Sequence, residues 1–148
     1  MSRHIAAIVG GGVIGGGWAA RFLLNGWDVR VFDPDPEAER KIGEVLANAR
    51  RSLPGLYDVA LPPEGTLRLC PTIAETVTSA DWIQESVPER LDIKHRVIRE
   101  IQAAARTDAV HRWQPVASDE VAGGVTAQES TLGLEFQANR ASAIRCKG

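Results

Sequence analysis

The chain has 148 residues, a formal net charge of −2, 44% hydrophobic residues and 24% charged residues. This length is enough for one domain with a hydrophobic core and short for two. The near-neutral charge gives no reason to expect nucleic acid or an anionic membrane surface as a partner. No apolar run approaches the roughly 20 residues that a membrane span needs. The composition therefore indicates an ordinary globular protein that works in solution.

Cysteine and histidine usage argues against a disulfide framework and against a metal site. Only Cys70 and Cys146 occur, and no N-terminal stretch has the pattern of a secretory signal. We therefore expect a reducing, cytoplasmic location. The three histidines, His4, His95 and His111, share no metal-ligand spacing with the cysteines.

The chain opens with a predicted strand, helix and strand. The apolar run 5–10 ends at glycines, which is typical of a buried strand. A helix follows and ends at the pair Asn25 and Gly26. Its apolar residues recur at the spacing of one helix face: Val13, Ile14, Trp18, Phe22 and Leu23. Residues 27–33 alternate in polarity and predict a second strand that ends at Asp33.

A second helix is predicted from Asp35, as the N-cap, to about Leu53. Its expected inward residues are Ile42, Val45, Leu46 and Ala49. Residues 54–66 hold three prolines and two glycines and predict a loop. A third strand is expected at 67–70, and a capping box predicts a short helix over 72–78.

The alternation continues with a strand at 81–87, a helix over 90–106 and a fifth strand that starts at 109–110. The helix is predicted because Leu91, Lys94, Val97, Ile98 and Ile101 recur at helical spacings. Strands and helices in alternation predict an α/β fold, a Rossmann-type doubly wound parallel sheet with helices on both faces.

The pattern fails from residue 111 onward. Large apolar residues (Val, Ile, Leu, Met, Phe and Trp) number 34 in residues 1–110 and 8 in residues 111–148, with no sustained period among the latter. We therefore expect a nucleotide-binding domain over 1–110 and an irregular, weakly structured tail over 111–148.

A glycine-rich segment joins the first strand to the first helix. The sequence Gly10-Gly11-Gly12-Val13-Ile14-Gly15 is a G-x-G-x-x-G, and the acidic Asp33 follows 18 residues after Gly15. In this context the spacing is the dinucleotide-binding fingerprint. The first glycine permits the tight turn, the second admits the pyrophosphate, and the third lets the helix pack closely on the strand. The helix N-terminus would bind the diphosphate.

Asp33 is expected to accept hydrogen bonds from the adenosine ribose. A carboxylate there repels a 2′-phosphate, and residues 34–36 offer no arginine to bind one, so the sequence favours NAD over NADP. Two alternatives stay open: FAD, which the same fingerprint serves, and a glycine-rich turn that binds nothing. We expect Trp18 to pack in the core.

A second polar group lies between the fourth strand and the following helix. Glu85, Glu89 and Lys94 belong to the run QESVPERLDIK, beyond the carboxyl end of a strand, where ligands sit in open α/β sheets. They are placed to face the ribose or nicotinamide of a dinucleotide. The alternative is that Glu89 and Lys94 are solvated charges at a helix end.

These two motifs resemble the N-terminal domain of the 3-hydroxyacyl-CoA dehydrogenase superfamily over residues 5–110. The run DWIQESVPERLDIK is similar to that of the L-carnitine 3-dehydrogenase subgroup. The resemblance implies that residues 10–15 bind the NAD pyrophosphate, that Asp33 binds the ribose, and that Glu89 and Lys94 contact NAD. It also implies oxidation of a 3-hydroxyl to a ketone on a small-molecule substrate, in a homodimer.

The sequence departs from the family pattern in its last part. The family's catalytic histidine precedes a proline, but no His-Pro pair occurs here, and no Ser-Ser-Thr-Ser run follows the fifth strand. We therefore assign no catalytic residue, His111 included. We expect the chain as given to lack the catalytic half, and a tail that is read out of frame accounts for the abrupt change. A short, natural NAD-binding or regulatory module without catalysis is the alternative.

Overall fold

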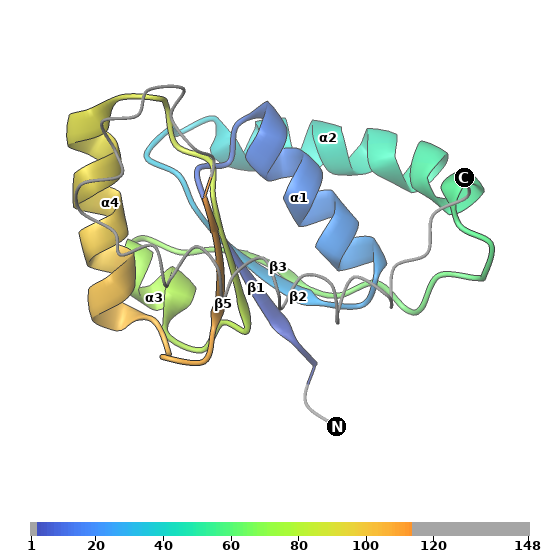
Figure 1. The fold of residues 1–148 in the computed structure, drawn as a ribbon. Coiled ribbons are helices and arrows are strands. Elements are labelled where there is room, and N and C mark those ends of the chain that lie inside the picture. The colour runs from blue at the N-terminus through green and yellow to red at the C-terminus, as the bar shows by residue number, and fades with distance from the viewer. Residues whose placement is uncertain (1–2, 114–148) are drawn as a thin grey trace.

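The computed structural model describes residues 3–113, which form a parallel sheet covered by helices on both faces (Figure 1). The five strands lie in the order β3-β2-β1-β4-β5. Their bounds are β1 (Ile5–Val9), β2 (Asp28–Phe32), β3 (Leu67–Leu69), β4 (Trp82–Glu85) and β5 (Val110–Trp113). The helices are α1 (Val13–Leu24), α2 (Ala38–Ser52), α3 (Ile73–Val77) and α4 (Leu91–Ala104), with a 3₁₀ turn, η1, at Leu53–Leu56. The predicted Rossmann-type α/β fold is confirmed.

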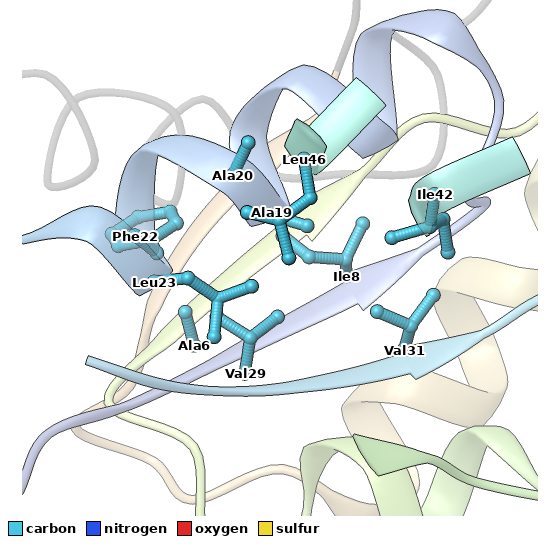
Figure 2. Packing of buried hydrophobic residues seen from close by; sticks show 10 residues of the cluster. All are labelled: Ala6, Ile8, Ala19, Ala20, Phe22, Leu23, Val29, Val31, Ile42 and Leu46. Carbon is cyan, nitrogen blue, oxygen red and sulfur yellow. The ribbon is translucent and has the colours of Figure 1, made fainter. Parts of the chain in front are cut away.

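The central strand β1 contributes to two hydrophobic cores because its side chains alternate between the faces of the sheet. Ala6 and Ile8 pack beneath α1 and α2, together with Val29 and Val31 of β2 (Figure 2). Ala7 and Val9 pack on the opposite face with residues of α3 and α4. A strand buried on both sides must be apolar throughout, which explains why the run 5–9 has no polar residue.

The strand register aligns three carboxyl ends at one edge of the sheet. Val9 at the end of β1 lies opposite Phe32 at the end of β2 and opposite Glu85 at the end of β4. The segments that follow these strands therefore begin side by side, although the chain separates them widely. This edge is where an open parallel sheet binds its ligand.

Two local details of the prediction are confirmed. The Thr72 hydroxyl accepts a hydrogen bond from the backbone N–H of Glu75 at 3.1 Å and caps α3. Gly26 has φ +81° directly after the end of α1, as expected of a glycine that terminates a helix.

Other details were wrong. The helix expected from Asp35 starts at Ala38, because the Asp35 carboxylate accepts from the N–H of Glu37 and closes a turn ahead of the helix. The loop expected from residue 54 begins with the 3₁₀ turn η1. The strand β5 includes residues 111–113, which the prediction had placed in the irregular tail, and the rest of that tail lies outside the described residues. Within residues 3–113, no helix is long and apolar enough to cross a membrane.

Candidate functional site

The turn after β1 requires glycine at position 10. Gly10 has φ +97°, a backbone conformation that L-residues with a side chain rarely adopt. Its N–H donates to the carbonyl of Phe32 at 2.9 Å, which ties the turn to the end of β2. A Cβ atom on Gly10 would lie 2.7 Å from the carbonyl carbon and oxygen of Ser86. The turn is therefore wedged between the segments that leave β2 and β4.

Gly15 allows α1 to cross this turn at close range. A Cβ atom there would lie 1.8 Å from the carbonyl oxygen of Gly10 and 3.2 Å from Cγ2 of Ile8. Only glycine permits this approach, as the fingerprint predicts.

Gly12 contrasts with Gly15, because a Cβ atom on Gly12 would meet no atom of residues 3–113 within 4 Å. Gly12 is also the N-cap of α1 and has no side chain to cap the first helical turn. The N–H groups of a first turn have no partner within the helix, and they carry the positive end of the helix dipole. The open space in front of Gly12 therefore fits the approach of an anionic group such as a pyrophosphate.

Asp33 lies half-buried at the end of β2 and binds the glycine turn. Its Oδ2 atom accepts a hydrogen bond from the N–H of Gly11 at 2.6 Å, and its Oδ1 atom accepts from the N–H of Asp35 at 2.8 Å. Each carboxylate oxygen has a second lone pair that a ribose hydroxyl can use. Asp33 thus fits the ribose role and also orients the turn itself.

The first basic side chains that follow Asp33 in the sequence, Arg40 and Lys41, form ion pairs with other carboxylates. Lys41 binds Asp35 at 2.5 Å, and this contact lowers the pKa of the Asp35 carboxyl. Arg40 forms ion pairs with Glu37 and Glu44 at 2.7 and 2.6 Å. Among the interactions of these two cations, none is with Asp33 within the described residues.

Val13 and Ile14, the two residues between the glycines, are exposed to 86% and 49%. The expectation that they belong to the buried face of the first helix was wrong, because the first turn of α1 projects beyond the carboxyl edge of the sheet. The same helix buries Phe22 and Leu23 about two and a half turns later, over the sheet. Trp18 packs against the core beside Phe22 and Trp82, as expected. Two apolar side chains therefore stand beside the candidate pyrophosphate site.

Glu85 and Lys94 form an ion pair inside the protein. Lys94 Nζ lies 3.1 Å from Glu85 Oε2, and only 2% of each side chain is exposed. The other carboxylate oxygen of Glu85 accepts a hydrogen bond from the N–H of Val87 at 2.7 Å. The alternative that Lys94 is a solvated charge at a helix end is therefore wrong.

Glu89 lies exposed in the segment 86–90, which connects β4 to α4. His111 lies on β5, where its backbone pairs with Ile83, and it lines a small hollow together with Glu85. Among the predicted residues, the structure thus brings the glycine turn, Asp33 and the β4–α4 segment to one edge. Ser86, whose backbone contacts Gly10, was missed by sequence reasoning, although its position just after a strand end was a usable signal.

Comparison with known proteins agrees with this geometry. Residues 5–112 match the model of the NAD-binding domain of 3-hydroxyacyl-CoA dehydrogenase. The chain belongs to this family. Its described fold is the family's NAD-binding domain, and the family model implies NAD as the cofactor.

Similar proteins within the family carry carnitine dehydrogenase names. The chain is 75% identical over 105 residues to an L-carnitine dehydrogenase/betainyl-CoA thioesterase of Ruegeria pomeroyi. It is 60% identical over 105 residues to an L-carnitine dehydrogenase of Mesorhizobium japonicum. These matches cover 71% of the chain but only 22% and 29% of the two relatives, so the chain matches less than a third of either protein.

Solved structures support the fold. A 5-formyl-3-hydroxy-2-methylpyridine 4-carboxylic acid 5-dehydrogenase, an NAD⁺-dependent dismutase, aligns with a TM-score of 0.65 and 35% identity over 78% of this chain and 37% of its own. A (S)-3-hydroxybutyryl-CoA dehydrogenase from Ralstonia eutropha aligns with a TM-score of 0.59 at 18% identity, over 76% of this chain and 41% of its own. At that identity the second likeness speaks for the fold alone.

Proposed function

We propose that this chain binds NAD across the carboxyl edge of its sheet, for a dehydrogenase that oxidises a 3-hydroxyl to a ketone. The observation that carries the proposal is the glycine turn. Its Gly12 leaves open space in front of the N-terminus of α1, and Asp33 holds its Gly11 N–H at 2.6 Å. These two features support a pyrophosphate at the turn and a ribose at Asp33.

The division of labour follows the strand order. The N-terminus of α1 lies above β1 and would take the pyrophosphate. Asp33 follows β2, so the adenosine half would lie on that side. The nicotinamide half would then extend over β4, where Glu89 and Lys94 belong to the segment and helix that follow the strand. NAD, when bound, supplies the acceptor for the hydride that leaves the alcohol carbon.

NAD is proposed over NADP because the site is acidic where a 2′-phosphate would lie. Asp33 stands there, and Lys41 and Arg40 are both paired with carboxylates. L-Carnitine is the substrate that we propose for the intact dehydrogenase. The support is the 75% identity to the Ruegeria pomeroyi protein, which is named an L-carnitine dehydrogenase/betainyl-CoA thioesterase.

Calorimetric titration of the 148-residue chain with NADH and NADPH tests the binding proposal. We expect NADH to bind and NADPH to bind at least about 10-fold more weakly. Asp33→Ala should weaken NADH binding by about 10- to 100-fold, because hydrogen bonds to a charged group contribute roughly 1.5–3 kcal/mol. Asp108→Ala is the matched control, since Asp108 is exposed and precedes β5, at the opposite edge of the sheet.

Two results would contradict the proposal. If the unmodified chain is folded but binds no NADH, the proposal that it binds NAD is refuted. An Asp33→Ala variant with unchanged NADH affinity would show that the ribose lies elsewhere. The substrate proposal is tested with the intact dehydrogenase. The rate of NAD reduction is measured with L-carnitine and with a 3-hydroxyacyl-CoA, and the faster substrate identifies the class.

A further inference from the structure

Glu85 occupies an unusual position for a carboxylate. It is the last residue of β4, it is 2% exposed, and its strand neighbour on the same face is the core residue Ile83. The helix that covers it presents Val97 and Ile101 to the core at its other inward positions. The ion pair with Lys94 therefore interrupts an otherwise apolar interface between β4 and α4.

Stability alone does not account for this pair. Removing two charges from water carries a desolvation penalty, and well-packed apolar residues of similar volume often replace a buried ion pair with no loss of stability. The position of the pair also matters, because Glu85 ends β4 at the proposed ligand-binding edge and accepts a hydrogen bond from Val87 in the segment 86–90. Charged pairs buried at such a position are candidates for a functional role.

The two oxygens of Glu85 serve two different elements. Oε2 accepts from Lys94 Nζ on the first turn of α4, and Oε1 accepts from the N–H of Val87, the second residue of the connecting segment. Ser86 lies between Glu85 and Val87 in the sequence. Its backbone lies against Gly10, and its N–H donates a hydrogen bond to the carbonyl of Val9. One carboxylate therefore fixes the start of α4, the segment 86–90 and, through that segment, one wall of the glycine turn.

We propose that Glu85 is a positioning residue for the nicotinamide half of the cofactor. It holds the buried Lys94 and the N–H of Val87, so that the segment that carries Glu89 faces the ligand without reorganising when it binds. The inference rests on the proposed NAD binding and goes beyond it, because it assigns a role to a residue that touches no part of the ligand. It also predicts that the two halves of NAD respond differently to loss of Glu85, since Asp33 and Gly12 bind the other half.

The test compares NADH with ADP, which represents the adenosine diphosphate half alone. Calorimetric titrations use the full chain, Glu85→Gln and the control Glu64→Gln, which breaks an exposed pair with Arg50. We expect Glu85→Gln to raise the dissociation constant of NADH at least about 10-fold and that of ADP less than about twofold. Glu64→Gln should change neither.

A second variant keeps the test decisive if Glu85→Gln does not fold, as judged by circular dichroism. Glu85→Asp retains the negative charge but is one methylene shorter, so it cannot reach both Val87 N–H and Lys94 Nζ. It should show the same selective loss of NADH affinity. Unchanged NADH affinity in a folded variant overturns the inference. Equal losses for NADH and ADP overturn it too, since they indicate a general structural role. Failure of the unmodified chain to bind NADH at all would instead refute the proposed function.

Discussion

The crossing of α1 over the glycine turn makes a strong prediction about Gly15→Ala. The added methyl group would lie 1.8 Å from the carbonyl oxygen of Gly10, where real contacts are at least 3.0 Å. The carbonyl or the helix must therefore move by about 1.2 Å in an interior packed as tightly as a crystal. No flexible side chain can absorb this shift, because Gly10 is held by Phe32 and lies against Ser86. Overpacking costs about 1–3 kcal/mol in ordinary cores, and we expect about 3 kcal/mol or more here.

The same helix supplies the matched control, Gly17→Ala. A Cβ atom on Gly17 would meet no atom of the described part of the chain within 4 Å, and the residue is exposed. Replacing glycine by alanine in a helix interior stabilises it by about 0.8–1 kcal/mol. In thermal unfolding followed by circular dichroism, Gly17→Ala should melt about 4 °C higher than the unmodified chain and Gly15→Ala more than about 10 °C lower. Equal melting temperatures for Gly15→Ala and the unmodified chain would refute the close helix–strand contact.

Two further predictions concern ligand binding and pH. Gly12→Ala should change the free energy of unfolding by less than about 0.5 kcal/mol, because the added methyl group meets no described residue. The same methyl group would occupy the approach of the pyrophosphate, so NADH binding should weaken at least about 10-fold. Thermal unfolding measures the first effect, and calorimetric titration with NADH measures the second. Hydrogen bonds from the N–H and hydroxyl of Thr66, with the nearby Arg3, lower the pKa of Asp28 below its ordinary 3.8. This stabilisation is present above pH 3.8 and is lost as the pH falls through the lowered pKa. Urea unfolding should therefore find Asp28→Asn less stable at pH 7 by up to about 1 kcal/mol, a value reduced by the partial exposure of Asp28, with a smaller difference below about pH 4. An equal difference at both pH values would contradict the linkage.

The sequence sufficed for most of the fold because the periodicities are unambiguous. The strand β1 is an uninterrupted apolar run between polar residues and a run of glycines, and α4 has a clear apolar stripe. The local chemistry of the glycine turn was also predictable, since the backbone conformation of Gly10 and the close contact of Gly15 depend on residues nearby in the chain.

Features that depend on distant residues could not be predicted in this way. Helical spacing groups Lys94 with the apolar residues of α4, but whether its amine reaches solvent is decided by Glu85, which lies on β4. The exposure of Val13 and Ile14 depends on how far α1 extends beyond the sheet, which helical periodicity does not report. The late start of α2 follows from the Asp35 side chain closing its own turn first.

The glycine turn is assembled from parts of the chain that meet only in the finished sheet. Phe32 and Ser86, which hold it in place, come from β2 and from the segment after β4. No local stretch of polypeptide can therefore form the cofactor site before the strands have paired. Hydrogen exchange at the Gly10 amide should then occur only through global opening. A cofactor that bound this turn would bind only completely folded molecules, and a higher cofactor concentration would raise the native fraction of the protein.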